Sequence, residues 1–353
     1  MVKKIGLIGF AIVLVVGFMY RGKIKRLFSE DTRTINKKEV KILFRDTPSL
    51  DELATVLEEN NIVENRQEVI DFVRNNGVDS TQFAAGKYIV LSKTQRSTLI
   101  NGFVKTENGH GLAEVKVNVD FNNCPTIEAM AKNISECILA DSSSIVNYIY
   151  APTTLEKYGF TKEQVPSLFL PQQYEMYFDT DAASFVAFMA NEFKVFWNAE
   201  RMAKMKGIGF NAQSKVATLA SIVYSEQSKD NNEWSIIAKL YLNRLDKGIL
   251  LQSDPTFKFC WGDALKGVDR LTYKHRDIDC PYNTYLYHGL PPGPIYITPA
   301  KVIDAVLNPA DVNYIFMMAK PGGGGHNFAV TNAQHEKNVV IYRKWYKEYK
   351  RNQ

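Results

Sequence analysis

The sequence predicts a mixed α+β protein in which a short apolar segment precedes two folded regions. Three observations carry this expectation. Residues 5–20 form an uncharged apolar run directly after Lys3 and Lys4. Between residues 40 and 121, short alternating strand patterns and amphipathic helix patterns follow one another, and from residue 151 onwards helical patterns dominate. With 353 residues the chain has room for two or three domains.

The composition is that of a globular protein. Hydrophobic residues make up 45% and charged residues 23% of the chain, which excludes a disordered protein. The formal net charge of +5 is modest, and much of it lies at the ends, in Arg21–Arg26 and Arg343–Arg351. We find no basic stripe interleaved with aromatic residues of the kind a nucleic-acid groove needs. We therefore expect no nucleic-acid partner.

The N-terminal segment is interpreted as a membrane anchor. The run Ile5–Tyr20 is at the short end for a membrane span and also fits the core of a signal peptide. No small-x-small cleavage site follows it, which favours a retained signal anchor at residues 5–20, a cytoplasmic stretch at 1–4 and a linker at 21–38. Basic residues flank the run on both sides, so charge alone does not give the orientation. The long folded region that follows favours export of the body.

The first folded region, residues 39–112, combines strands and helices. Ser49 with Glu52 forms a capping box that starts a helix through Leu53, Val56 and Leu57. Its further elements are expected as strands at Val40–Phe44 and Gly86–Leu91 and helices at Arg66–Arg74 and Ser97–Phe103.

The second folded region, residues 113–350, opens with a strand–helix–helix unit at 113–150. Apolar residues alternate between Val115 and Phe121, which is typical of a half-buried strand. The stretch Phe169–Tyr174 has the composition of a loop. Helices are then expected at Ala183–Trp197, Ser214–Glu226, Trp234–Leu245, from Asp254 as N-cap, from Thr298 as N-cap and from Thr331.

The four cysteines, Cys124, Cys137, Cys260 and Cys280, leave two interpretations open. None forms a C-x-x-C pair or a zinc-type spacing with a histidine, so no metal site is predicted. In an exported body they could pair as sequence neighbours, although four cysteines allow three connectivities. The alternative is buried free thiols.

The candidate catalytic residue is Glu226. Leu219, Val223 and Glu226 lie at i, i+4 and i+7, so on a helix they share one face. Glu226 would therefore stand where a buried stripe meets the surface. Desolvation disfavours ionisation there, which suits a general acid for glycoside cleavage. A surface carboxylate at a helix end is the alternative.

Several downstream residues are suited to saccharide binding. Gln252 and Asp254 would hydrogen-bond sugar hydroxyls, although Asp254 before Pro255 also fits a helix N-cap. Asn283 and Tyr285 offer an amide and a ring before a rigid proline-rich loop. His326 follows four consecutive glycines in a stretch expected to be a flexible loop. Packed tyrosines in a turn and an incidental loop histidine are the structural alternatives.

Taken together, these segments resemble one family, the MltG (YceG-like) endolytic murein transglycosylases. The resemblance covers roughly residues 40–345, and it also includes the N-terminal anchor. It implies that the unit around Ala85–Tyr88 is a LysM-like domain. The segments that carry it are Leu219–Val223 followed by Glu226, Asn243–Leu245, Leu251–Thr256, Tyr282–Tyr285, Gly289–Ile295 and Gly325–Phe328.

The resemblance implies a membrane-anchored polysaccharide lyase. It would cleave the MurNAc–GlcNAc bond of peptidoglycan endolytically, form 1,6-anhydroMurNAc ends and limit nascent strand length. It needs no cofactor, works with peptidoglycan synthases, and places a single-pass anchor in the cytoplasmic membrane with the catalytic domain outside. The family motif has two carboxylates where this chain has Tyr224 and Glu226, so only Glu226 keeps an acidic side chain.

Two other functions remain open at this point. A hydrolytic muramidase would need a second carboxylate, and Asp254 is the candidate. A non-catalytic peptidoglycan-binding scaffold would not need Glu226 at all.

Overall fold

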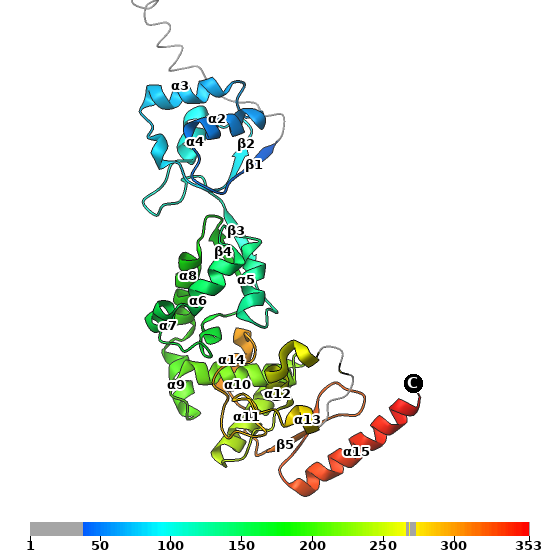
Figure 1. Ribbon diagram of the computed structural model, residues 1–353. Helices are drawn as coiled ribbons and strands as arrows, with labels where there is room; N and C mark the ends of the chain where they lie inside the picture. The colour runs from blue at the N-terminus through cyan, green and yellow to red at the C-terminus, as the bar shows by residue number, and fades with distance from the viewer. Residues whose placement is uncertain (1–37, 266–267, 269–272, 353) are drawn as a thin grey trace, which may run out of the picture. The chain divides into compact units, whose positions relative to one another are not determined.

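The structure is a computed structural model that describes residues 38–265, 268 and 273–352 (Figure 1). It is a mixed α+β fold of helices and small two-stranded sheets. The described chain forms two compact units, one up to Lys116 with Tyr177–Asp179 and one of 117–176 and 180 onwards. The predicted anchor at residues 5–20 lies outside the described residues. Among those described, no helix is both long and apolar enough to cross a membrane.

The first unit packs helices around one antiparallel strand pair. Strand β1 (Glu39–Phe44) pairs with β2 (Gly86–Leu91) so that Glu39 faces Leu91 and Phe44 faces Gly86. Alternate residues of β1 are buried, as the period of two requires, and they contact the apolar faces of the helices. The Ser49 hydroxyl accepts from the backbone N of Glu52, which confirms the predicted helix start. The helices are α2 (Leu50–Glu59), α3 (Arg66–Asn76) and α4 (Arg96–Gly102), with a short 3-10 turn at Ser80–Gln82.

The second unit opens with strand β3 (Lys116–Asp120), which pairs with β4 (Gln173–Tyr177). No strand was predicted at β4, and its first residues, Gln173 and Tyr174, fall in the stretch expected to be a loop, so that expectation is wrong. β4 alternates exposed and buried residues, and Tyr174 and Met176 enter the core. Thr126 caps the first helix through the backbone N of Ala129. The helices packed here are α5 (Ile127–Ser135), α6 (Ser142–Tyr150), α7 (Pro152–Tyr158) and α8 (Ala182–Phe196), with a 3-10 turn at Val165–Leu168.

A further core of the second unit forms around helix α10 (Gln213–Glu226). Residues 216–223 of α10 are buried on every side, so this helix is the central element. Its neighbours are α9 (Ala199–Gly207), α11 (Trp234–Asp246), α12 (Asp254–Trp261), α13 (Tyr273–Arg276) and α14 (Ala300–Leu307), the antiparallel pair β5 (Phe316–Ala319) and β6 (His326–Ala329), the long α15 (Asn332–Arg351), and 3-10 turns at Asn231–Glu233 and Gly262–Leu265.

The proline-rich loop is fixed against this core. The backbone N of Ile295 donates to the hydroxyl of Ser221 inside α10 at 3.0 Å. Gly293 lies so close to the backbone of Glu163 that a Cβ would be 1.9 Å from its carbonyl oxygen, which excludes any side chain there. The loop therefore holds the C-terminal half of α10 in place.

Cys260 and Cys280 form a disulfide, whereas Cys124 is a buried free thiol. The bond closes a loop with a sequence separation of 20 residues. Because a crosslink restricts the unfolded chain, we expect Cys260→Ser with Cys280→Ser to lower the free energy of unfolding of the second unit by about 3 kcal/mol. All four tryptophans lie in this unit, so urea denaturation followed by tryptophan fluorescence measures it. Cys137→Ser is the control, and an equal loss in that variant would contradict the assignment.

Candidate active site

A pocket of about 500 Å³ opens where the C-terminal end of α10 meets α11, β5, β6 and the start of α15. It joins segments that are more than 100 residues apart in the sequence. Its lining is mainly polar around one carboxylate. The side chains that matter below are Glu226, Tyr241, Arg244, Gln252, Asp254, Tyr285, His326, His335 and Tyr342.

Glu226 is the last residue of α10 and lies where this buried helix emerges into the pocket. Its Oε1 accepts a hydrogen bond from the Tyr241 hydroxyl at 2.8 Å and another from the Ser253 hydroxyl at 2.5 Å. Its Oε2 accepts none of the hydrogen bonds found among the described residues. The side chain is thus oriented by two donors on one oxygen while the other oxygen remains available to a ligand.

The surroundings favour the protonated form of Glu226. Desolvation by burial raises its pKa, and the negative charge of Asp254 adds to this rise, whereas the hydrogen bonds from Ser253 and Tyr241 partly oppose it. The C-terminal end of a helix carries partial negative charge, which disfavours a carboxylate at this position further. Glu226 therefore keeps its proton to higher pH than a surface glutamate, as a general acid requires.

Ser253 is held by a small buried network of hydroxyls. Its backbone N donates to Thr284 Oγ1 at 3.0 Å, and Thr284 Oγ1 also bonds Thr256 Oγ1 at 2.8 Å. Ser253 and Thr256 are fully buried. The Ser253 hydroxyl is therefore fixed in place before any ligand arrives.

Gln252 lies in the pocket wall in a strained backbone conformation. Its φ of 51° is uncommon for a residue with a side chain. Its backbone N donates to the carbonyl of Thr284 at 3.0 Å, and its side-chain carbonyl accepts from Arg244 at 3.3 Å. Because its side-chain oxygen is bonded to Arg244, the side-chain amide NH₂ is the group left to bind a ligand. Gln252 lines the pocket.

Arg244 is a buried support beneath this wall. Its guanidinium donates to the backbone carbonyls of Ile315 at 2.6 Å, Leu250 at 3.0 Å and Leu251 at 3.1 Å. It thereby links the residue just before strand β5 to the segment that carries Gln252 and Ser253. A buried guanidinium with several carbonyl acceptors fixes the relative position of these strands and loops.

Asp254 and Tyr285 act as a pair on the rim. The Tyr285 hydroxyl donates to Asp254 Oδ1 at 2.6 Å, and both residues line the pocket. The prediction that Asp254 caps helix α12 is wrong, because α12 begins at Asp254 and Ser253 occupies the N-cap position. The carboxylate of Asp254 accepts the tyrosine hydroxyl instead.

Asn283 does not reach the pocket, although it was predicted to bind ligand. It is completely buried, its amide nitrogen donates to the carbonyls of Arg276 and Ile278 at 2.7 and 2.8 Å, and its amide oxygen accepts from the backbone N of Tyr285. All its polar groups are thus used within the protein. Its role is to set the position of Tyr285.

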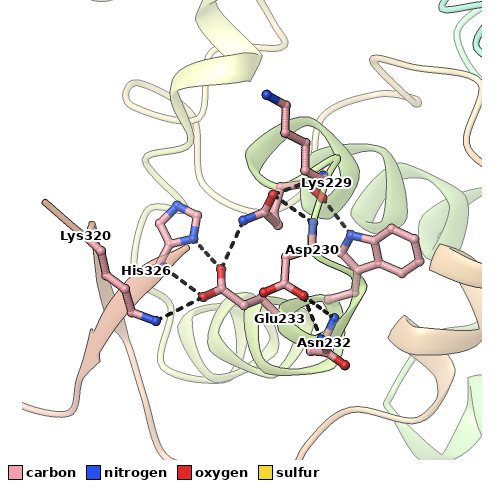
Figure 2. A network of polar contacts seen from close by, with 8 residues as sticks. Lys229, Asp230, Asn232, Glu233, Lys320 and His326 are labelled. Carbon is pink, nitrogen blue, oxygen red and sulfur yellow. Dashed lines mark hydrogen bonds and ion pairs between the residues drawn. The ribbon is translucent and has the colours of Figure 1, made fainter. Parts of the chain in front are cut away.

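His326 stands at the start of β6 and is oriented by a buried carboxylate (Figure 2). Glu233 accepts from the backbone N of His326 at 2.8 Å and from its Nδ1 at 2.7 Å. Gly325 makes this approach possible, because a Cβ there would lie 2.3 Å from Glu233 Oε1. Glu233 also lies 4.0 Å from Lys320 Nζ. Because Nδ1 is bonded to Glu233, Nε2 is the ring nitrogen left to bind a ligand in the pocket that His326 lines.

Four residues of the site were not predicted as functional: Ser253, Tyr241, Arg244 and Glu233. Tyr241 is buried in its helix, and its hydroxyl reaches Glu226. The signal that could have found it is the hydroxyl itself, since a fully buried tyrosine needs a hydrogen-bond partner. Glu233 gives no sequence signal, because its partner is 93 residues away.

The Ser253 hydroxyl stabilises the ionised form of Glu226, so its removal has a predictable sign. We expect Ser253→Ala to raise the pKa of Glu226 further, which moves the pH of half-ionisation upwards. NMR titration of the side-chain carboxyl carbon measures this shift. Ser225→Ala is the matched control, since the Ser225 hydroxyl donates to the Ser221 carbonyl instead. An unchanged or lowered pKa in Ser253→Ala would refute this account of the donor.

Comparisons with known proteins agree on one family. The model of the YceG-like family matches residues 44–340. The endolytic murein transglycosylase of Bacillus subtilis strain 168 is 38% identical over 109 residues, which are 31% of this chain and 29% of that protein. The endolytic murein transglycosylase of Streptococcus pneumoniae strain R6 is 25% identical over 232 residues, 63% of this chain and 40% of that protein. The chain thus matches less than half the length of these curated relatives.

A solved structure agrees on the fold. The crystal structure of a yceG-like protein from Listeria monocytogenes superposes with a TM-score of 0.52 at 21% sequence identity, covering 85% of this chain and 98% of that one. At this identity the likeness concerns the fold alone.

Proposed function

Since the chain belongs to the YceG-like family, we propose that it is an endolytic murein transglycosylase, a lyase that cleaves the MurNAc–GlcNAc bond of peptidoglycan. The observation that carries this proposal is Glu226, a carboxyl group with a raised pKa, held by two hydroxyl donors on the floor of a polar pocket. The names of the relatives from Bacillus and Streptococcus support the substrate class.

In the proposed reaction Glu226 acts first as an acid and then as a base. Its proton moves to the oxygen that links MurNAc to GlcNAc, and the bond between that oxygen and C1 of MurNAc breaks. The C6 hydroxyl of the same MurNAc attacks C1, and its proton returns to the Glu226 carboxylate. The product is a 1,6-anhydroMurNAc end, no water is consumed, and the carboxyl group is protonated again for the next cycle.

One carboxylate is sufficient for both steps, which fits the chain's having Tyr224 where the family motif has a second acidic residue. Tyr224 packs its ring against Tyr296 at 5.1 Å. Ser253 and Tyr241 stabilise Glu226 whenever it is ionised between the two steps.

The remaining pocket residues are proposed to position the substrate. Gln252, Tyr285 and His326 present an amide, a ring and an imidazole nitrogen to the sugar, and Asp254 accepts from its hydroxyls. Asn283, buried beneath Tyr285, takes a supporting role instead of contacting the glycan.

The cellular setting is part of the proposal. We propose that residues 5–20 anchor the chain in the cytoplasmic membrane, that residues 39–112 form a LysM-like unit, and that the catalytic body lies outside the membrane. There it would shorten nascent strands beside peptidoglycan synthases. The Cys260–Cys280 disulfide supports an exported body, because such bonds persist in oxidising compartments.

Digestion of purified glycan strands by the full chain tests the reaction. Mass spectrometry of the fragments should find anhydroMurNAc at the new ends. Reducing MurNAc ends would instead identify a hydrolytic muramidase, with Asp254 as the second carboxylate of the pocket. No new ends at all would favour a peptidoglycan-binding scaffold.

A further inference from the structure

Helix α15 carries an aromatic stripe that no core explains. Tyr342, Trp345, Tyr346 and Tyr349 lie at i, i+3, i+4 and i+7, so they share one face of the helix. This spacing is normally that of a buried face. Here no residue of α15 is buried, and Tyr346 and Tyr349 are 44% and 46% exposed.

The four rings form a continuous series along the helix. The ring centroids lie 6.2 Å apart for Tyr342 and Tyr346, and these rings are stacked; Trp345 and Tyr349 stack at 5.3 Å. Trp345 also contacts Tyr342 at 5.4 Å and Tyr346 at 6.4 Å. Each ring is therefore held by its neighbours although the helix face is open to solvent.

The series begins inside the candidate active site. Tyr342 lines the same pocket as Glu226. Seven residues before Tyr342, two turns earlier on the same face, His335 also lines this pocket. Its ring stacks on that of Phe316 in β5 with the centroids 5.0 Å apart. The face of α15 that lines the pocket thus continues beyond it as Trp345, Tyr346 and Tyr349, towards the C-terminal end of the helix.

We propose that Trp345, Tyr346 and Tyr349, the outer aromatic stripe, bind the sugar rings of a glycan strand where it leaves the pocket. This inference rests on the proposed function. The apolar C–H face of a pyranose stacks on an aromatic ring while the sugar hydroxyls stay in water, and tyrosine and tryptophan lose little conformational entropy when they bind. The stripe from Tyr342 to Tyr349 extends over about 10 Å, the order of one disaccharide.

One feature favours a glycan over other occupants. The stripe is continuous with the polar pocket that holds Glu226, and an enzyme that cuts within a strand must hold sugars on both sides of the cleaved bond.

The stripe predicts a preference for long strands. We expect Trp345→Ala with Tyr346→Ala and Tyr349→Ala, in the full chain, to lower the ratio of the cleavage rate on long purified glycan strands to that on a short muro-oligosaccharide by about tenfold. In the inactive Glu226→Gln background, the same three substitutions should weaken the binding of long strands in co-sedimentation to a similar degree. Val340→Ser is the control on the opposite face of the same helix and should leave the ratio and the binding unchanged.

The outcomes separate this inference from the proposed function. A triple variant that keeps the wild-type ratio and binds long strands normally would contradict glycan binding by the stripe, but it would not affect the proposed lyase activity. A wild-type chain that cleaves no glycan would contradict the proposed function. Co-sedimentation alone would then show whether the stripe binds glycan. If the triple variant loses binding to anionic lipid vesicles but keeps glycan binding, the stripe is a membrane contact and the proposal is wrong.

Discussion

Glu226→Gln is expected to lower the rate of anhydro-end formation by about 10³-fold or more, because the amide can neither donate the proton to the glycosidic oxygen nor accept the one from the C6 hydroxyl. The substitution keeps the size of the side chain, and Tyr241 and Ser253 can still donate to its oxygen. Binding of long strands should therefore persist while turnover is lost. Quantified release of anhydro-ended fragments measures the effect.

Glu200→Gln is the matched control for this prediction. Glu200 is an exposed glutamate on another helix of the same unit and pairs with Lys204 on the surface. Its replacement should leave the rate unchanged. If tryptophan fluorescence shows that the Glu226→Gln variant is folded and it still forms anhydro ends at the wild-type rate, Glu226 is not the catalytic residue.

Arg244→Ala is expected to destabilise the second unit by roughly 3–5 kcal/mol, the largest stability effect of the site. The substitution leaves the buried carbonyls of Ile315, Leu250 and Leu251 without their donor and opens a cavity under the pocket wall. Urea denaturation followed by tryptophan fluorescence reports on this unit alone.

Arg343→Ala provides the comparison, since Arg343 is exposed on α15 and should change the free energy of unfolding by at most about 0.5 kcal/mol. Arg244→Lys should recover only part of the stability, because an ammonium group cannot reach carbonyls in several directions as the guanidinium does. Equal stabilities of the two alanine variants would show that Arg244 is not a support of the pocket.

Local signals predicted two helix starts correctly. Ser49 and Thr331 each cap the helix expected from them, whereas the N-caps near Asp254 and Thr298 are Ser253 and Pro299. Glu226 was also accessible to sequence reasoning, because its position at the end of an apolar stripe depends only on helical geometry. Its partners were less so, since Ser253 lies 27 residues away and was seen only as part of a motif.

The failures share a physical cause: they depend on contacts between distant segments. Asn283 has the chemistry of a sugar ligand, but the backbone carbonyls of Arg276 and Ile278 claim its amide. Strand β6 was expected to be part of a glycine-rich loop, yet pairing with β5 and the bonds from Glu233 to His326 make it a strand.

The central claim is that one carboxyl group, Glu226, performs the cleavage without water. Digestion of long glycan strands in water labelled with heavy oxygen, followed by mass spectrometry of the new MurNAc ends, tests it most directly. We expect anhydro ends that are one water lighter than reducing ends and contain no label. Labelled reducing ends would contradict it, because they require water to attack C1 and a second catalytic group to activate that water.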